Sequence, residues 1–118
     1  IEWELLNSDA VDLAAEAVFG AGVTTHFDFS KADVVVSFGA DFLETWISPV
    51  EFSKQWASRR KPIAEAPMSY FAHFEPRLSL TGGNADKLFV NAPGSETLLL
   101  AALLKLVVGY RKGVDGVA

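Results

Sequence analysis

The clearest hydrophobic run in the chain is the segment Ala32 to Phe38, which contains three consecutive valines. β-Branched residues have restricted rotamers in a helix and favour extended structure. The run lacks apolar–polar alternation, and this pattern is typical of a strand that is covered on both faces in a parallel sheet. We therefore expect Ala32 to Phe38 to be a buried parallel strand.

Apolar residues at helical spacing predict a first and a last helix. The first follows the capping residues Asn7 to Asp9 and ends at Gly20, which can adopt a left-handed conformation. The last spans Ser95 to about Tyr110 and is apolar almost all round. Such a helix is normally buried on more than one side, so we expect missing parts of a larger protein to cover it.

A middle helix is predicted at the sequence Ser48-Pro49-Val50-Glu51, which has the form of a capping box with proline at the first helical position. Ile47 and Phe52 have the spacing of a hydrophobic staple. Phe52 and Trp56 lie one turn apart, and we expect both to face the sheet.

The remaining segments complete an α/β pattern. We expect a loop over Leu78 to Asp86 and strands at four places: Ile1 to Leu6, Val23 to Phe27, Ser69 to Phe74, and Lys87 to Val90. The predicted fold is a Rossmann-like three-layer domain with a mainly parallel sheet and helices on both faces. Residues 1–110 would form this single domain, and residues 111–118 a tail or linker.

Composition narrows the function classes. The chain has 118 residues, a net charge of −5 and no cysteine. It has no basic stripe, so nucleic acid is not an expected partner. Without cysteine, this chain alone cannot build a thiolate zinc site or an iron–sulfur cluster. The longest apolar run, Leu98 to Leu104, is much shorter than the ~20 residues of a membrane span. Because the chain begins with Ile1, we expect it to be processed or cut from a longer protein.

Ligands of open α/β sheets gather at the carboxyl ends of the strands, and two segments reach that edge. In the first, Gly39 permits a tight turn, and Asp41 can accept hydrogen bonds from a ribose or a base. An ordinary strand-to-helix turn explains the same residues, and a lone glycine favours that simpler interpretation.

The second segment follows the strand that ends near Phe74. It carries four hydrogen-bonding side chains within one turn: Glu75, Arg77, Ser79 and Thr81. These side chains can bind a phosphate or a nucleotide, or they can form a salt-bridged corner without a ligand. The sequence favours these two interpretations equally. His26 and His73 lack partners at metal-ligand spacing, so we expect structural histidines and no metal site. Ser37 lacks the flanking glycines of a nucleophile elbow, and we expect no catalytic residue.

Two longer motifs suggest a family. The first motif is the continuous segment from Phe27 to Trp46, with the sequence FDFSKADVVVSFGADFLETW. The second is Glu75-Pro76-Arg77-Leu78-Ser79-Leu80-Thr81, which is followed later by Pro93-Gly94-Ser95-Glu96. In order and spacing, across most of the chain, they resemble the molybdopterin oxidoreductase family. The resemblance is strongest to the iron–sulfur, molybdopterin-like subunit of alternative complex III, a bacterial quinol-oxidising membrane complex.

The resemblance implies a domain from a much larger electron-transfer chain, in which iron–sulfur clusters lie elsewhere. Cofactor-bearing relatives hold one arm of a molybdopterin guanine dinucleotide in such a domain. By that analogy the nucleotide pocket would be lined by Gly39, Asp41, Glu75, Arg77, Ser79 and Glu96. The resemblance also implies partners, namely the rest of the parent chain and other subunits of a membrane redox complex. It further implies a location on the periplasmic side of the membrane.

One departure from the family favours a domain that has lost this cofactor. Asp41 stands where many cofactor binders have asparagine, and its carboxylate would repel a pyrophosphate. We therefore expect a scaffold domain without bound cofactor, which is not catalytic in isolation. Two alternatives stay open: a functional guanine dinucleotide-binding arm, or a generic nucleotide-binding domain like the central domain of thiamine diphosphate enzymes.

Overall fold

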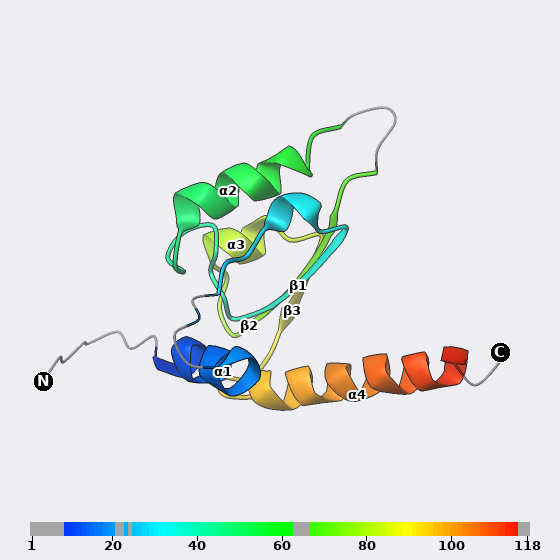
Figure 1. The fold of residues 1–118 in the computed structure, drawn as a ribbon. Helices are drawn as coiled ribbons and strands as arrows, with labels where there is room; N and C mark the ends of the chain where they lie inside the picture. Colours follow the sequence, from blue (N-terminus) through cyan, green and yellow to red (C-terminus); the bar gives the residue numbers. More distant parts are fainter. Residues whose placement is uncertain (1–8, 21–22, 24, 63–66, 116–118) are drawn as a thin grey trace, which may run out of the picture.

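The computed structural model describes residues 9–20, 23, 25–62 and 67–115, and Figure 1 traces their arrangement. Its strands form one parallel sheet in the order β1-β2-β3, so the predicted α/β class with a parallel sheet is confirmed. The predicted strand Ile1 to Leu6 lies outside the described residues. The elements in chain order are α1 (Asp9–Phe19), η1 (Phe29–Lys31), β1 (Val34–Phe38), α2 (Pro49–Ser58), β2 (Tyr70–Glu75), α3 (Leu80–Gly83), β3 (Lys87–Val90) and α4 (Glu96–Asp115).

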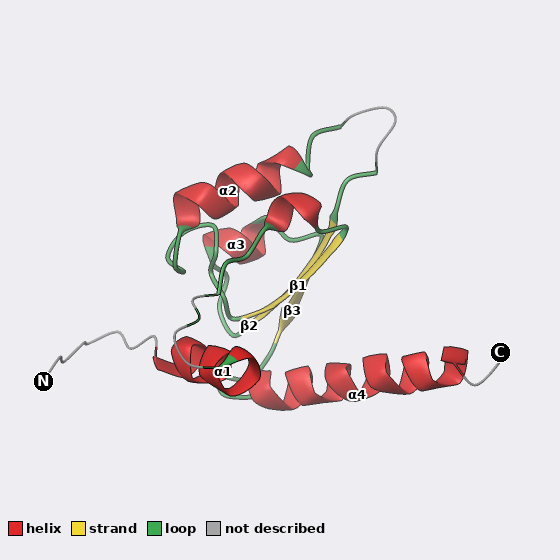
Figure 2. Ribbon diagram, viewed as in Figure 1, coloured by secondary structure: helices red, strands yellow, loops and turns green. Residues whose placement is uncertain are grey.

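The crossover helices α2 and α3 lie on the same side of the sheet, as Figure 2 shows. This follows from the strand order, because right-handed crossovers between successive parallel strands place their helices on one face. Val35 of β1 pairs in register with Phe71 of β2, and both side chains are buried on this face.

The hydrophobic core fills the space between α2 and the sheet. Val35, Phe42, Phe52 and Phe71 form its buried cluster, and Trp56 packs against it. The Trp56 ring meets Phe71 edge-on, with centroids 6.2 Å apart. The prediction that Phe52 and Trp56 face the sheet is confirmed, and burying two such rings supplies much of the driving force for this packing.

The opposite face of the sheet is largely open within the described chain. Val34 is 62% exposed and Val36 is 41% exposed, so the expectation that β1 is covered on both faces is wrong. An aromatic ladder crosses this face: Phe38 stacks on Phe74 at 4.6 Å, and Phe74 stacks on Phe89 at 4.5 Å. The apolar run in β1 therefore reflects a hydrophobic outer surface as well as a core.

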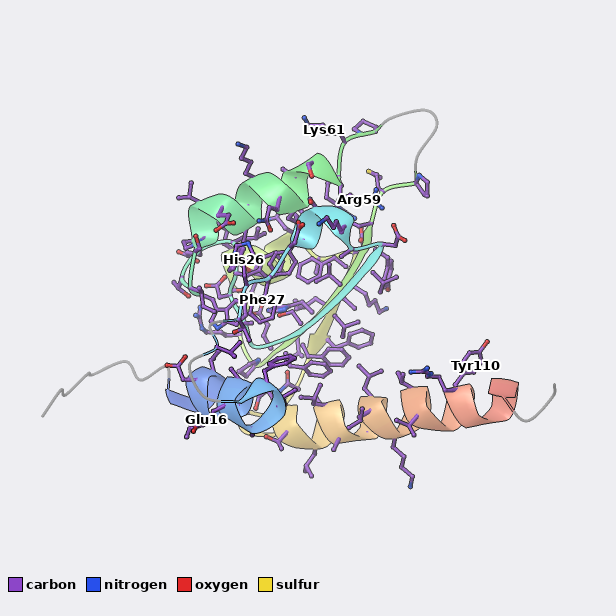
Figure 3. All side chains as sticks on the ribbon, in the orientation of Figure 1. Glu16, His26, Phe27, Arg59, Lys61 and Tyr110 are labelled. Atoms are coloured by element: carbon purple, nitrogen blue, oxygen red, sulfur yellow. The ribbon has the colours of Figure 1, made fainter. Side chains whose placement is uncertain are left out.

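Helix α4 runs past the sheet and presents most of its apolar residues to solvent (Figure 3). Tyr110 is 77% exposed and projects from the helix near its far end. The described part of the chain therefore does not cover this helix by itself, and the expectation that missing parts of a larger protein cover it stays a prediction. The helix continues to Asp115, five residues past the predicted end. In the part of the chain that the structure describes, no helix is both long and apolar enough to cross a membrane.

The start of α2 differs in detail from its sequence motif. Ser48 is the N-cap residue, but its side chain makes no capping hydrogen bond. Glu51 instead accepts a hydrogen bond from Gln55 at 3.0 Å and lies 3.3 Å from Nε2 of His26. Trp46, rather than the predicted Ile47, packs against Phe52, with ring centroids 5.9 Å apart. The helix position is confirmed, but its capping box and staple are not formed.

Two other local predictions need correction. Residues 23 and 25–27 form no strand; Phe27 instead contacts the rings of Trp46 and Phe52, and that packing fixes its backbone. The predicted loop from Leu78 to Asp86 contains the single-turn helix α3. Ser79 starts this turn, since its hydroxyl accepts a hydrogen bond from the Gly82 N–H at 3.0 Å. The two glycines that suggested a loop lie inside the turn.

Candidate functional site

The carboxyl ends of β1 and β2 lie side by side, as the parallel pairing requires. Gly39 directly follows β1, and its N–H donates a hydrogen bond to the Phe74 carbonyl at 2.8 Å. Its φ of +67° is a conformation that glycine adopts without steric cost. The two segments singled out in the sequence therefore meet at one edge of the sheet.

Glu75, at the end of β2, is turned into the protein. Its carboxylate is buried and accepts a hydrogen bond from the Ser79 N–H at 2.8 Å. Burial opposes the charged form, but the hydrogen bonds from Ser79 and the proximity of the His73 ring outweigh it, so the pKa of Glu75 lies below its ordinary value. Glu75 is thus a charged internal anchor for the turn that begins α3.

Gly82 makes this anchor possible. A Cβ atom at position 82 would lie 1.8 Å from Oε1 of Glu75, well inside van der Waals contact. The neighbouring Gly83 has nothing within 4 Å of the same constructed atom. Glycine is therefore required at position 82 by the approach of the carboxylate, whereas position 83 carries no such demand.

Asp41 is also buried and also points inward. The Thr81 hydroxyl donates a hydrogen bond to its Oδ1, and the Thr45 hydroxyl donates one to Oδ2 at 3.2 Å. Thr81 Oγ1 in turn accepts a hydrogen bond from the Leu43 N–H at 3.1 Å. The carboxylate therefore ties the loop after β1 to helix α3, and its oxygens are engaged by the protein itself.

Gly39 and Glu96 form a second, more accessible pair. A Cβ atom on Gly39 would lie 4.0 Å from Cγ of Glu96, so α4 begins beside the loop after β1. Glu96 accepts a hydrogen bond from Nδ2 of Asn91 at 3.0 Å. Its own backbone N–H and this amide hold the pKa of Glu96 below its ordinary value. Glu96 is therefore negatively charged at neutral pH.

Five of the six predicted pocket residues separate into three groups, and Arg77 stands apart from them. Glu75 and Ser79 are buried and bonded to each other; Asp41 is buried and bonded to Thr81; Gly39 and Glu96 adjoin at the surface. Arg77 is exposed and makes no ion pair with any described residue. The strand ends therefore hold a buried polar network rather than a set of groups aimed at a ligand.

His73 lies at the base of this network. It is fully buried on β2, and its Nε2 is 3.2 Å from Oε2 of Glu75. Its ring also packs 5.7 Å from that of Phe71. His73 thus lies between the aromatic core and a buried carboxylate. In the described part of the chain, no three side chains of metal-ligating type come together.

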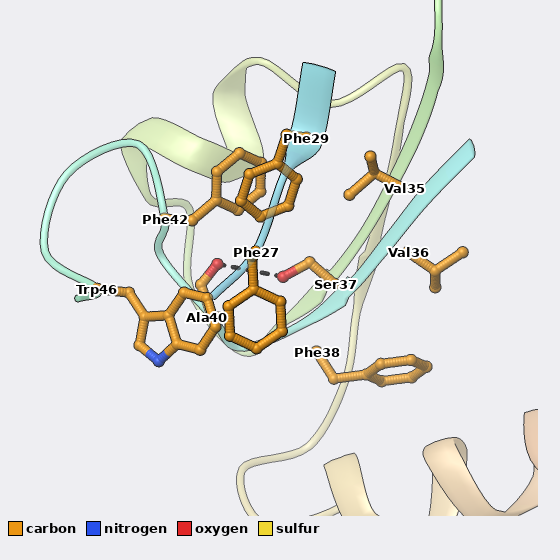
Figure 4. A pocket seen from close by; sticks show the side chains of 9 residues that line it. All are labelled: Phe27, Phe29, Val35, Val36, Ser37, Phe38, Ala40, Phe42 and Trp46. Atoms are coloured by element: carbon orange, nitrogen blue, oxygen red, sulfur yellow. Dashed lines mark hydrogen bonds between the residues drawn. The ribbon is translucent and has the colours of Figure 1, made fainter. Parts of the chain in front are cut away.

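Sequence reasoning missed a small apolar pocket beside β1, which Figure 4 shows from close by. Its volume is about 190 Å³. The Ser37 hydroxyl lies in its wall and donates a hydrogen bond to the Ala40 carbonyl at 3.1 Å. Five aromatic side chains contribute to the lining: Phe27, Phe29, Phe38, Phe42 and Trp46. All five lie within residues 27–46, but they belong to segments predicted to be different elements, and pattern reasoning does not show how these segments pack against one another.

Comparisons with known proteins add no relatives. No protein-family model matches the chain, and no curated protein shows a significant match. The functional interpretation therefore depends on the sequence motifs and on the geometry described above.

Proposed function

We propose that this chain is a scaffold domain of a molybdopterin oxidoreductase-like protein involved in electron transfer, and that it holds no cofactor of its own. The proposal rests on the motifs around Gly39 to Asp41 and Glu75 to Ser79. The observation that carries its scaffold part is the direction of the carboxylates of Asp41 and Glu75, which bind internal donors instead of facing solvent.

A guanine dinucleotide would compete with these internal bonds. To contact a nucleotide, Glu75 would have to release the Ser79 N–H, and Asp41 would have to release Thr81. Each release leaves a buried donor without an acceptor, at a cost of about 1–3 kcal/mol. The residues at positions 41, 75 and 79 therefore do not fit a nucleotide-binding role, and no chemical step is assigned to this chain.

The exposed apolar surface supports the idea of a larger parent. Leu104 and Leu106 of α4, like Val34 on the open sheet face, are more than half exposed. Where exposed apolar side chains form a patch, the patch typically marks an interface. In the proposal, the remainder of the parent chain and neighbouring subunits of a membrane redox complex cover it, on the periplasmic side of the membrane.

A guanine dinucleotide-binding arm is the second candidate, and the accessible residues favour it. Gly39, Arg77 and Glu96 are not buried, and an exposed arginine that makes no ion pair with any described residue suits a phosphate. Metal analysis of the intact parent protein separates the two candidates. The scaffold proposal predicts molybdenum and tungsten far below one atom per chain, and a stoichiometric amount of either metal would overturn it.

A further inference from the structure

The apolar pocket beside β1 has the features of a small binding site. It lies where β1 ends and the following loop begins, an edge at which α/β proteins commonly bind ligands. Its volume of about 190 Å³ exceeds the roughly 150 Å³ of an apolar cavity known to hold benzene. The pocket is therefore large enough for one ring of a small molecule.

The walls select for flat, uncharged groups. Figure 4 shows the rings of Phe27 and Trp46 together on one side of the pocket, with centroids 5.2 Å apart and planes tilted by 49°. Phe29 and Phe42 stack at 4.6 Å. None of the described residues that line the pocket is charged, so an ion would lose hydration there without compensation. Aromatic walls instead favour another ring in offset or edge-on contact.

Ser37 adds one polar preference. Its hydroxyl hydrogen is directed to the Ala40 carbonyl, which leaves the oxygen lone pairs. None of the described residues donates a hydrogen bond to this oxygen. A ligand that carries an O–H or N–H group on its ring can therefore supply the missing donor.

From these features we infer that the pocket beside β1 binds an uncharged aromatic ring bearing one hydrogen-bond donor, of the phenol or indole type. This site is separate from the strand-end network of Asp41 and Glu75, and it does not depend on the proposed scaffold function. Ligands of this size bind with dissociation constants on the order of 1 mM.

Methyl NMR of the isotope-labelled chain tests the inference with phenol, toluene and benzoate as probes. Phenol should shift the methyl signals of Val35, Val36 and Ala40 saturably. Toluene, which lacks the donor, should bind about fivefold more weakly, and benzoate should not bind. Ser37→Ala should reduce phenol binding to the level of toluene, while toluene binding stays unchanged.

A matched pair of variants keeps the test independent of Ser37. Phe27→Ala removes one aromatic wall of the pocket and should weaken phenol binding about fivefold. Tyr70→Ala removes a half-exposed ring beside Val34 on the open sheet face, outside the lining, and should leave binding unchanged. Thermal melting checks that both variants fold.

Three results would overturn the inference: shifts that do not saturate, benzoate binding equal to that of phenol, or no difference between the two variants. Nuclear Overhauser contacts from Trp46 to another segment of the chain inside the pocket, together with no probe binding, would show that the protein fills the space itself. That result would also overturn the inference.

Discussion

Gly82→Ala is the substitution that most directly probes the inward position of Glu75. The new Cβ would lie 1.8 Å from Oε1, so the carboxylate must move and release the Ser79 N–H. Losing a hydrogen bond to a buried charged group costs about 1.5–3 kcal/mol. Forcing an extra methyl group into a packed site costs about 1–3 kcal/mol. Alanine is a better helix former than glycine, and this difference offsets up to ~1 kcal/mol of the lost stability.

The expected loss is therefore about 3 kcal/mol in the free energy of unfolding, measured by urea denaturation. Gly83→Ala is the matched control in the same turn; with nothing near its Cβ, it should change stability by no more than about 1 kcal/mol, in the stabilising direction. Glu75→Asp, whose shorter side chain withdraws from position 82, should partly restore the stability of Gly82→Ala. Equal effects of the two glycine substitutions would refute the close contact between Glu75 and α3.

Three further predictions concern charge and surface. Because the pKa of Glu75 is lowered on folding, its charged form stabilises the protein fully above the unfolded pKa of about 4.5. This stabilisation disappears as the pH falls through the folded pKa. The difference in unfolding free energy between wild type and Glu75→Gln should therefore shrink in denaturation curves taken from pH 6 to 3. Asp86 forms a bidentate pair with Arg60 at 2.7 Å and accepts a hydrogen bond from the Phe71 N–H at 2.8 Å. Asp86→Asn should therefore lower the free energy of unfolding by about 1–2 kcal/mol. Asp33→Asn is the control, at a side chain that is 86% exposed, and should lower it by less than about 0.5 kcal/mol in the same assay. Leu104→Gln on the exposed side of α4 should change the unfolding free energy of this chain by less than about 0.5 kcal/mol, and a loss above about 2 kcal/mol would mean that α4 is packed in solution.

Local chemistry made much of the fold predictable. The consecutive valines of β1, the proline at the start of α2 and the apolar run of β3 each have strong and consistent local preferences, and these elements lie where the sequence placed them. The end of α1 at Gly20 follows the same logic, with a φ of +94°. Such elements are specified by residues within a few positions of one another, which is the range that pattern reasoning covers.

Features that depend on distant residues were harder to predict. Helix α3 contains two glycines that weaken it locally, and it is held by Glu75 and by the bond from Thr81 to Asp41, which spans 40 residues. The exposure of Val34 and Val36 depends on what covers the second face of the sheet, and hydrophobicity alone does not specify that. For Asp41, the sequence supplied a carboxylate at the correct edge, but whether it points outward or inward is decided by the hydroxyls of Thr45 and Thr81.

We propose that the strand-end carboxylates of Asp41 and Glu75 serve the protein interior and do not bind a nucleotide. Calorimetric titration of the chain with GDP, with ADP as the comparison, tests it most directly. We expect no saturable heat with either nucleotide up to about 1 mM. Saturable GDP binding that weakens in Arg77→Gln and Glu96→Gln would contradict it and support a guanine dinucleotide-binding arm, and equally tight ADP binding would instead indicate a generic nucleotide-binding domain.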